Sequence, residues 1–249
     1  MCPSLELDPY GDADEYPLFV VPEHKISVQD VFDMCSDYYA GTEFDCSRTL
    51  ESGPFGNPLS IRNVYRPINM FRCTYVQIAN IKGWLPEEAR CLVWFGLGAS
   101  DSTYLTPMFA SATEIPEIYG EGKRLEPYTN DSAWWTCSHV QQVSTINYIA
   151  AKPYIDAVRD PKMESVYKQT ERAQRMAASM CVLGMNEEAR DYLTNFAYYA
   201  AEDWHEQWIN LGNNLESTLM LGNVDMRGPK VSDWWKNLVK TTPLKPLEN

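Results

Sequence analysis

The sequence lacks the features that several classes of protein require. It has no run of about 18 apolar residues, so no membrane-spanning helix is predicted. Only 21 residues are Lys or Arg against 34 Asp or Glu, and the basic residues do not cluster, which argues against nucleic-acid binding and against docking to an anionic membrane. The first eight residues contain neither a basic nor an apolar segment. No signal peptide is therefore expected, and a cytoplasmic location is favoured.

Cysteine and histidine occur without the spacing of a metal site or a disulfide framework. The seven cysteines are odd in number and form no C-x-x-C, so we expect reduced thiols. Of the three histidines, His205 precedes Glu206 but lacks the second histidine of H-E-x-x-H, and we expect its side chain on the polar side of a helix. Spacing pairs no histidine with a cysteine. Neither a metal nor another cofactor is predicted.

The hydrophobic pattern changes from strand-like to helical along the chain. Closely spaced apolar and β-branched runs predict three strands joined as an antiparallel meander, since parallel crossovers need a dozen or more residues. Residues spaced as on one helix face predict four helices, with Pro153 bending or ending the second. The strands are expected at 68–78, 91–97 and 103–110, and the helices at 28–39, 131–151, 162–180 and from Asn186 for about 30 residues.

Strands in the first half followed by long helices predict the α+β class. No shift in composition marks a boundary, so residues 1–249 are expected to form a single domain, with an irregular tail over residues 223–249. With 45% hydrophobic and 22% charged residues, the chain has an ordinary globular balance and is long enough to bury a sizeable core.

Five short motifs occur in a defined order within the first 135 residues. They are Gly53-Pro54-Phe55-Gly56-Asn57-Pro58, Arg66-Pro67-Ile68, Val93-Trp94-Phe95-Gly96, Ala112-Thr113-Glu114-Ile115-Pro116-Glu117 and Asp131-Ser132-Ala133-Trp134-Trp135. In order and spacing they resemble the C-terminal half of the cysteine dipeptidases of the dipeptidase A type, N-terminal-nucleophile hydrolases related to the secernins. The resemblance covers about residues 3–222, including Trp208-Ile209-Asn210-Leu211-Gly212 in the last long helix.

The resemblance implies a fold and a reaction. The fold would be part of a four-layer αββα sandwich, and the reaction would be hydrolysis of dipeptides by an N-terminal cysteine through an acyl-enzyme, without a cofactor. The half that carries the nucleophile has no counterpart in this chain. Three interpretations stay open: a fragment of an intact dipeptidase, one half of a split enzyme, or a non-catalytic paralogue that acts as a peptide-binding or interaction module. The expected partners are a dipeptide substrate and either a nucleophile-bearing N-terminal half or further copies of the chain.

Cys2 is the residue to be weighed first as a nucleophile. An N-terminal cysteine can attack an amide with its own α-amino group as the base, since that amine has a pKa of about 7.7–8.0. Pro3 follows directly, however, and hinders removal of the initiator methionine, and the segment between Pro3 and Pro9 is too short and proline-bounded for a buried nucleophile strand. We therefore disfavour Cys2.

Arginines near the first predicted strand are the remaining candidates for the site. A guanidinium can hold the free carboxylate of a dipeptide bidentately, or it can form a structural salt bridge with one of the many acidic residues. We favour Arg72, which is expected inside the strand, with Arg66 second. Trp134 and Trp135 are expected either in the core or as the wall of a pocket.

Overall fold

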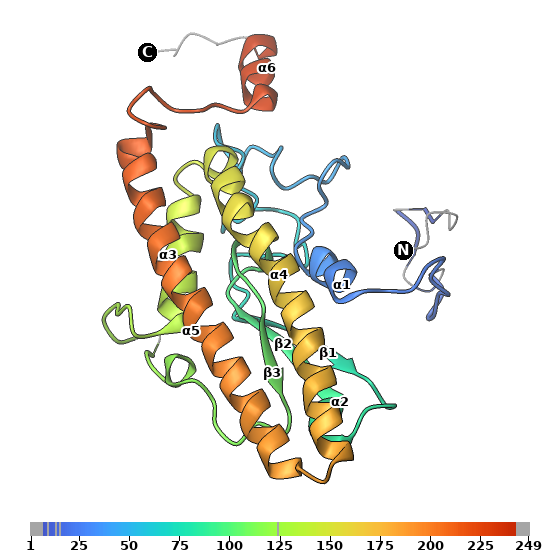
Figure 1. The fold of residues 1–249 in the computed structure, drawn as a ribbon. Coiled ribbons are helices and arrows are strands. Elements are labelled where there is room, and N and C mark those ends of the chain that lie inside the picture. Colours follow the sequence, from blue (N-terminus) through green and yellow to red (C-terminus); the bar gives the residue numbers. More distant parts are fainter. Residues whose placement is uncertain (1–6, 9, 13, 15, 124, 243–249) are drawn as a thin grey trace.

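A three-stranded antiparallel sheet, covered on one face by long helices, lies at the centre of the fold (Figure 1). The computed structural model describes residues 7, 8, 10–12, 14, 16–123 and 125–242. The strands are β1 (Tyr75–Ile81), β2 (Cys91–Leu97) and β3 (Thr106–Phe109), in the order β1-β2-β3. Tyr75 pairs with Leu97, and Leu92 pairs with Phe109. The α+β class and the antiparallel meander are confirmed.

The first strand begins later than the sequence predicts. The segment 68–74 forms turns, in which the backbone N–H of Asn69 donates to the carbonyl of Asp37 (3.0 Å) and that of Cys73 to Met70 (3.0 Å). Because these N–H groups bond within turns and to Asp37, they are not available for pairing with a neighbouring strand. Arg72 therefore lies in the turn before β1, and the expectation that it stands inside the strand is wrong.

The motif Val93-Trp94-Phe95-Gly96 ends in glycine because the space beside residue 96 is occupied. A Cβ atom at this position of β2 would lie 2.3 Å from the carbonyl oxygen of Tyr104, closer than any side chain tolerates. The connection between β2 and β3 thus packs directly on the strand because residue 96 has no side chain.

Two long antiparallel helices cover the buried face of the sheet (Figure 1). They are α4 (Tyr148–Val182, 35 residues, about 52 Å long) and α5 (Asn186–Thr218). Trp94 of β2 packs edge-on against Tyr167 of α4, with ring centroids 4.6 Å apart, and Tyr104 stacks on Trp204 of α5 at 4.8 Å. These aromatic side chains form the centre of the core.

Pro153 lies inside α4 and does not end a helix. The predicted helix over 131–151 is instead two elements, because α3 (Ala133–Ser144) ends and α4 begins at Tyr148. Pro153 cannot donate to the carbonyl of Ile149, four residues earlier, and the ammonium of Lys230 donates to that oxygen instead (3.2 Å). This substitute bond lets the helix continue through the proline.

Three shorter helices complete the fold. In α1 (Val28–Cys35), Ser27 and Asp30 form a capping box, and the helix ends four residues before the predicted Tyr39. The others are α2 (Glu87–Arg90) and α6 (Asp233–Thr241). The tail over residues 223–249 was expected to be irregular, and α6 corrects this expectation: Ser232 accepts the N–H of Trp235 and starts the helix.

The second face of the sheet is only partly covered. Tyr75 and Ile81 of β1 are 57% and 64% exposed. Val93 of β2 and its partner Met108 of β3 lie on the same face and are half-buried. At one end Phe95 packs against Tyr119, with centroids 5.7 Å apart. The rest of this apolar surface, which we call the open sheet face, has no layer over it among the described residues.

None of the helices within the described ranges combines the length and apolar character needed to cross a bilayer.

Candidate functional site

A pocket of about 890 Å³ lies where β1 begins, β2 ends and one face of α3 is exposed. Its volume is in the range of small-ligand sites. Counted from Trp134, the lining residues of α3 and its C-cap stand at positions i, i+1, i+4, i+7, i+8 and i+11, so they share one helix face. The lining residues are Asn57, Leu59, Ser60, Ile61, Phe71, Arg72, Cys73, Thr74, Gly98, Trp134, Trp135, Ser138, Gln141, Gln142 and Thr145.

The start of α3 fixes the aromatic wall of this pocket. Ser132 is buried, and its hydroxyl accepts the N–H of Trp135 (3.4 Å), so Trp134 and Trp135 occupy the first turn. Their rings meet edge-on with centroids 4.6 Å apart, and Tyr128 supports Trp135 from the other side at 6.0 Å. Both tryptophans therefore line the pocket and are held in a defined orientation.

Gln141 connects α3 to the two segments that form the floor of the pocket, which are the turn at Phe71 and the loop after β2. Its carbonyl oxygen accepts the N–H of Ala99 (2.9 Å), and its amide donates to the carbonyl of Phe71 (3.0 Å). Gly98 has a φ of +86°, and a Cβ there would lie 3.0 Å from Gln141 Oε1. The loop after β2 thus approaches α3 closely, which glycine permits.

Arg72 stands at the rim, and its guanidinium carbon lies 5.3 Å from the centroid of the Phe71 ring. The side chain is exposed, and among the described residues no acidic group pairs with it. Arg66 is also exposed but does not line the pocket; its carbonyl accepts the hydroxyl of Tyr39 (3.1 Å). Of the two candidate arginines, therefore, Arg72 lines the pocket and Arg66 does not.

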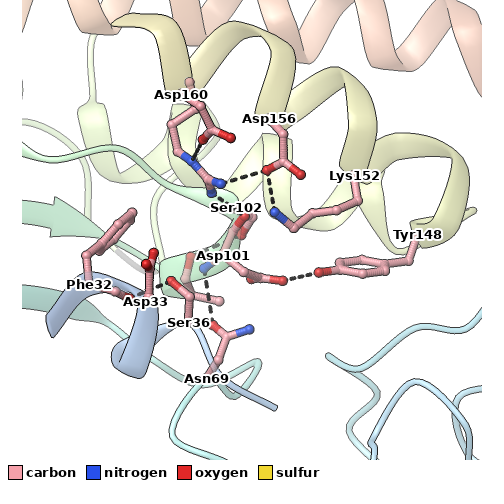
Figure 2. Close-up of polar contacts among 12 residues, drawn as sticks. Phe32, Asp33, Ser36, Asn69, Asp101, Ser102, Tyr148, Lys152, Asp156 and Asp160 are labelled. Carbon is pink, nitrogen blue, oxygen red and sulfur yellow. Dashed lines mark hydrogen bonds and ion pairs between the residues drawn. The ribbon is translucent and has the colours of Figure 1, made fainter. Parts of the chain in front are cut away.

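A buried polar network supports the loop that floors the pocket (Figure 2). Asp101 follows the Gly98-Ala99 turn and is 2% exposed; its carboxylate accepts the hydroxyl of Tyr148. Arg159 donates to the Asp101 carbonyl (2.8 Å) and pairs with Asp156 (2.6 Å), which Lys152 also contacts. Tyr148 and Ala99 form one apolar cluster with Leu59 and Phe71 of the pocket. The hydrogen bonds of Asp101 with Tyr148 and Arg159 thus hold the loop after β2, which forms one side of the pocket, against α4.

Burial raises the pKa of two groups in this network, Asp101 and Tyr148. Desolvation raises the pKa of Asp101, although hydrogen bonds from Tyr148 and Asn69 and the charges of Lys152 and Arg159 oppose the shift. The pKa of Tyr148 is raised well above its ordinary value, chiefly by burial and by the carboxylate of Asp101. At neutral pH the tyrosine is therefore a hydrogen-bond donor to Asp101.

Within the described ranges, the only thiol that lines this pocket is that of Cys73. Cys2 lies outside the described residues. Cys137 lies on the buried side of α3, and desolvation raises the pKa of its thiol to about 12, which disfavours the thiolate. Cys73 lines the pocket and is half-buried, and its thiol contacts the carbonyl of Ile68 (3.4 Å).

His205 corrects another expectation from the sequence. It is 8% exposed rather than on the polar side of α5; one ring nitrogen contacts the hydroxyl of Thr136 (3.2 Å) and the other the carbonyl of Asn130 (2.6 Å). His139 pairs with Glu216 (2.9 Å). Both histidines hold α3 to α5 or to the loop before α3. In the described part of the chain, no three His, Cys, Asp or Glu side chains gather in a way that could hold a metal ion.

Comparison with known proteins identifies the family. Residues 2–160, more than half of the chain, match the sequence model of peptidase family C69. The chain is 24% identical over 168 residues to a dipeptidase of Bifidobacterium longum (68% of this chain, 27% of that protein). It is 29% identical over 115 residues to the probable dipeptidase A of Streptococcus pyogenes serotype M3 (46% and 23%), and 24% identical over 136 residues to the probable dipeptidase B of Lactococcus lactis (54% and 27%).

These matches span about a quarter of the length of the curated relatives. On the evidence of the family match, this chain belongs to peptidase family C69.

Proposed function

We propose that this chain forms the substrate-binding part of a cysteine dipeptidase, and that a segment outside the chain supplies the nucleophile. The observation that carries the proposal is the guanidinium of Arg72, which no acidic group in the described part of the chain pairs with, at the rim of a pocket walled by Trp134 and Trp135. A dipeptide has a free carboxylate next to a side chain, and a cation beside an apolar wall is complementary to both. The names of the relatives, dipeptidase and probable dipeptidase, point to the same substrate class.

The proposed chemistry is that of an N-terminal cysteine. The sulfur attacks the peptide carbonyl carbon while the α-amine of the same cysteine accepts the thiol proton. Collapse of the tetrahedral intermediate breaks the C–N bond, and the leaving amine takes that proton. Water then attacks the thioester, releases the first amino acid and restores the thiol. Arg72 holds the carboxylate of the leaving residue and so fixes the scissile bond relative to the sulfur.

The open sheet face is the proposed contact surface for the segment that carries the nucleophile. It is apolar, and an apolar sheet face is stable in water only when another layer covers it. A second sheet there would produce the αββα sandwich that the family resemblance implies. Tyr75 and Ile81 would then be buried between the two sheets.

The test is dipeptide hydrolysis by the native protein that contains this chain, purified from its own cells and followed by release of free amino acids. We expect hydrolysis that a thiol-alkylating reagent abolishes. Arg72→Gln should raise KM for a dipeptide about tenfold or more, because a charge-assisted bidentate pair is lost. Arg66→Gln serves as the matched control and should leave KM unchanged.

Two results would contradict the proposal. Hydrolysis that is insensitive to thiol reagents would exclude a cysteine nucleophile. Tight binding of dipeptides without turnover, unaffected by Cys2→Ala, would identify the chain as a peptide-binding module instead.

A further inference from the structure

The charges around the pocket are unevenly distributed. Of the residues that the structure describes, Arg72 is the only charged one in its lining, although the chain has a formal net charge of −13. No carboxylate of the lining could neutralise the arginine or hold the α-ammonium group of a peptide. The lining therefore suits the carboxylate end of a dipeptide, and it offers no acidic group for the amino end.

The apolar part of the lining is larger than a carboxylate requires. Trp134 and Trp135 stand on one side, while Phe71 and the buried Leu59 lie against the loop of the floor. A pocket of about 890 Å³ has room for a large side chain next to the carboxylate. Half-buried indole rings held edge-on to each other offer an aromatic ligand the stacked and edge-to-face contacts that it prefers.

Polar side chains along α3 also line the pocket. Ser138, Gln142 and Thr145 share the α3 face that points into the pocket. Each can donate to or accept from a peptide amide whose carboxylate is at Arg72. The lining thus has a cation, hydrogen-bonding groups and an aromatic wall in one cavity.

We propose that this pocket selects dipeptides whose C-terminal residue is aromatic or large and apolar, with that side chain against Trp134 and the carboxylate at Arg72. This inference rests on the proposed function, because it takes a dipeptide as the ligand. Beyond the proposed function, the inference states that the chain recognises the C-terminal end of the dipeptide and that the pocket prefers aromatic or large apolar side chains there.

The test is the affinity of the full chain for Gly-Phe, Gly-Ala and the amide of Gly-Phe, measured by calorimetry. We expect Gly-Phe to bind about tenfold or more tightly than Gly-Ala, since the phenyl group buries more apolar surface than a methyl group. The amide, which lacks the carboxylate, should bind about as weakly as Gly-Phe binds to Arg72→Gln. Trp134→Leu should reduce the preference for Gly-Phe to a few-fold while keeping the difference between acid and amide.

Trp84→Leu is the matched control, because Trp84 is 80% exposed in the turn between β1 and β2 and does not line the pocket. Equal affinity for Gly-Phe and Gly-Ala would overturn the inference, as would an unchanged preference in a folded Trp134→Leu chain or a failure to bind either dipeptide. Release of amino acids is assayed in the same samples. Binding with the expected preference but without turnover would uphold the inference and agree with a nucleophile outside this chain, whereas turnover by the chain alone would contradict that part of the proposed function.

Discussion

Asp101 is a carboxyl group enclosed in the protein, and its raised pKa links stability to pH. Because its pKa in the folded chain exceeds the ordinary value of 3.8, the folded protein keeps a proton that the unfolded chain has already released. The resulting stabilisation is complete below pH 3.8 and is lost as pH rises through the folded-state pKa. The Asp101 contribution therefore favours acidic conditions.

Asp101→Asn tests this dependence, because its side-chain oxygen can still accept the bond from Tyr148. We expect the free energy of unfolding of the variant, relative to that of the native chain, to increase as pH is raised from 4 to 7. Urea unfolding at several pH values measures the difference. Asp156→Asn, at a partly exposed position of the same network, is the comparison; an identical pH dependence for native and Asp101→Asn chains would contradict the assignment.

The sequence anticipated part of the pocket at the level of single residues. Arg72 and the tryptophan pair were singled out from their type and position, and all three line the cavity. Gln141 was missed, although its place on the same helical face as Trp134 was a usable signal. His205 was misjudged, because its neighbours in the sequence are polar while its neighbours in space, Thr136 and Asn130, come from another part of the chain.

One buried amide on α4 fixes the position of the sheet. Gln174 is 1% exposed; its amide donates to the carbonyl of Ala89 (2.9 Å), and its oxygen accepts from the ammonium of Lys82 (2.7 Å). Gln174→Met leaves both groups without this partner. We expect a loss of about 2–3 kcal/mol in the free energy of unfolding, measured with urea, because buried polar groups would be left unpaired.

Gln169→Met on the same helix is the matched control. Gln169 is exposed and bonds only to Ser165 one turn earlier, so a change within about 0.5 kcal/mol is expected. Equal effects of the two substitutions would show that Gln174 does not hold the sheet to α4.

The elements differ in how well the sequence predicts them. The apolar run Cys91–Leu97 and the long periodic segment from Asn186 appear as β2 and α5, because both are strong local patterns. The continuous α4 could not be predicted at Pro153, since the bond that replaces the lost one comes from Lys230, about 80 residues away. Such a contact leaves no local signal in the sequence.

The open sheet face predicts the association behaviour of the whole molecule. The isolated chain should self-associate with increasing concentration, because an exposed apolar sheet surface favours contact with another such surface. Ile81→Lys together with Tyr75→Lys should give a monomer in sedimentation experiments. Leu183→Lys, at an equally exposed position between α4 and α5, is the control and should not change the association. A native chain that is monomeric at high concentration would contradict this expectation.

The order of the strands has a consequence for how the chain acquires its structure. Every ladder of the sheet joins neighbouring strands within residues 75–109, and the α4–α5 pair is joined by three residues, so these pairings are local in sequence. Short connections close with little loss of entropy, so the sheet and the helix pair can each form soon after their residues are synthesised. The contacts between sheet and helices, such as that of Tyr104 with Trp204, join distant parts of the chain and can form only once α5 is complete.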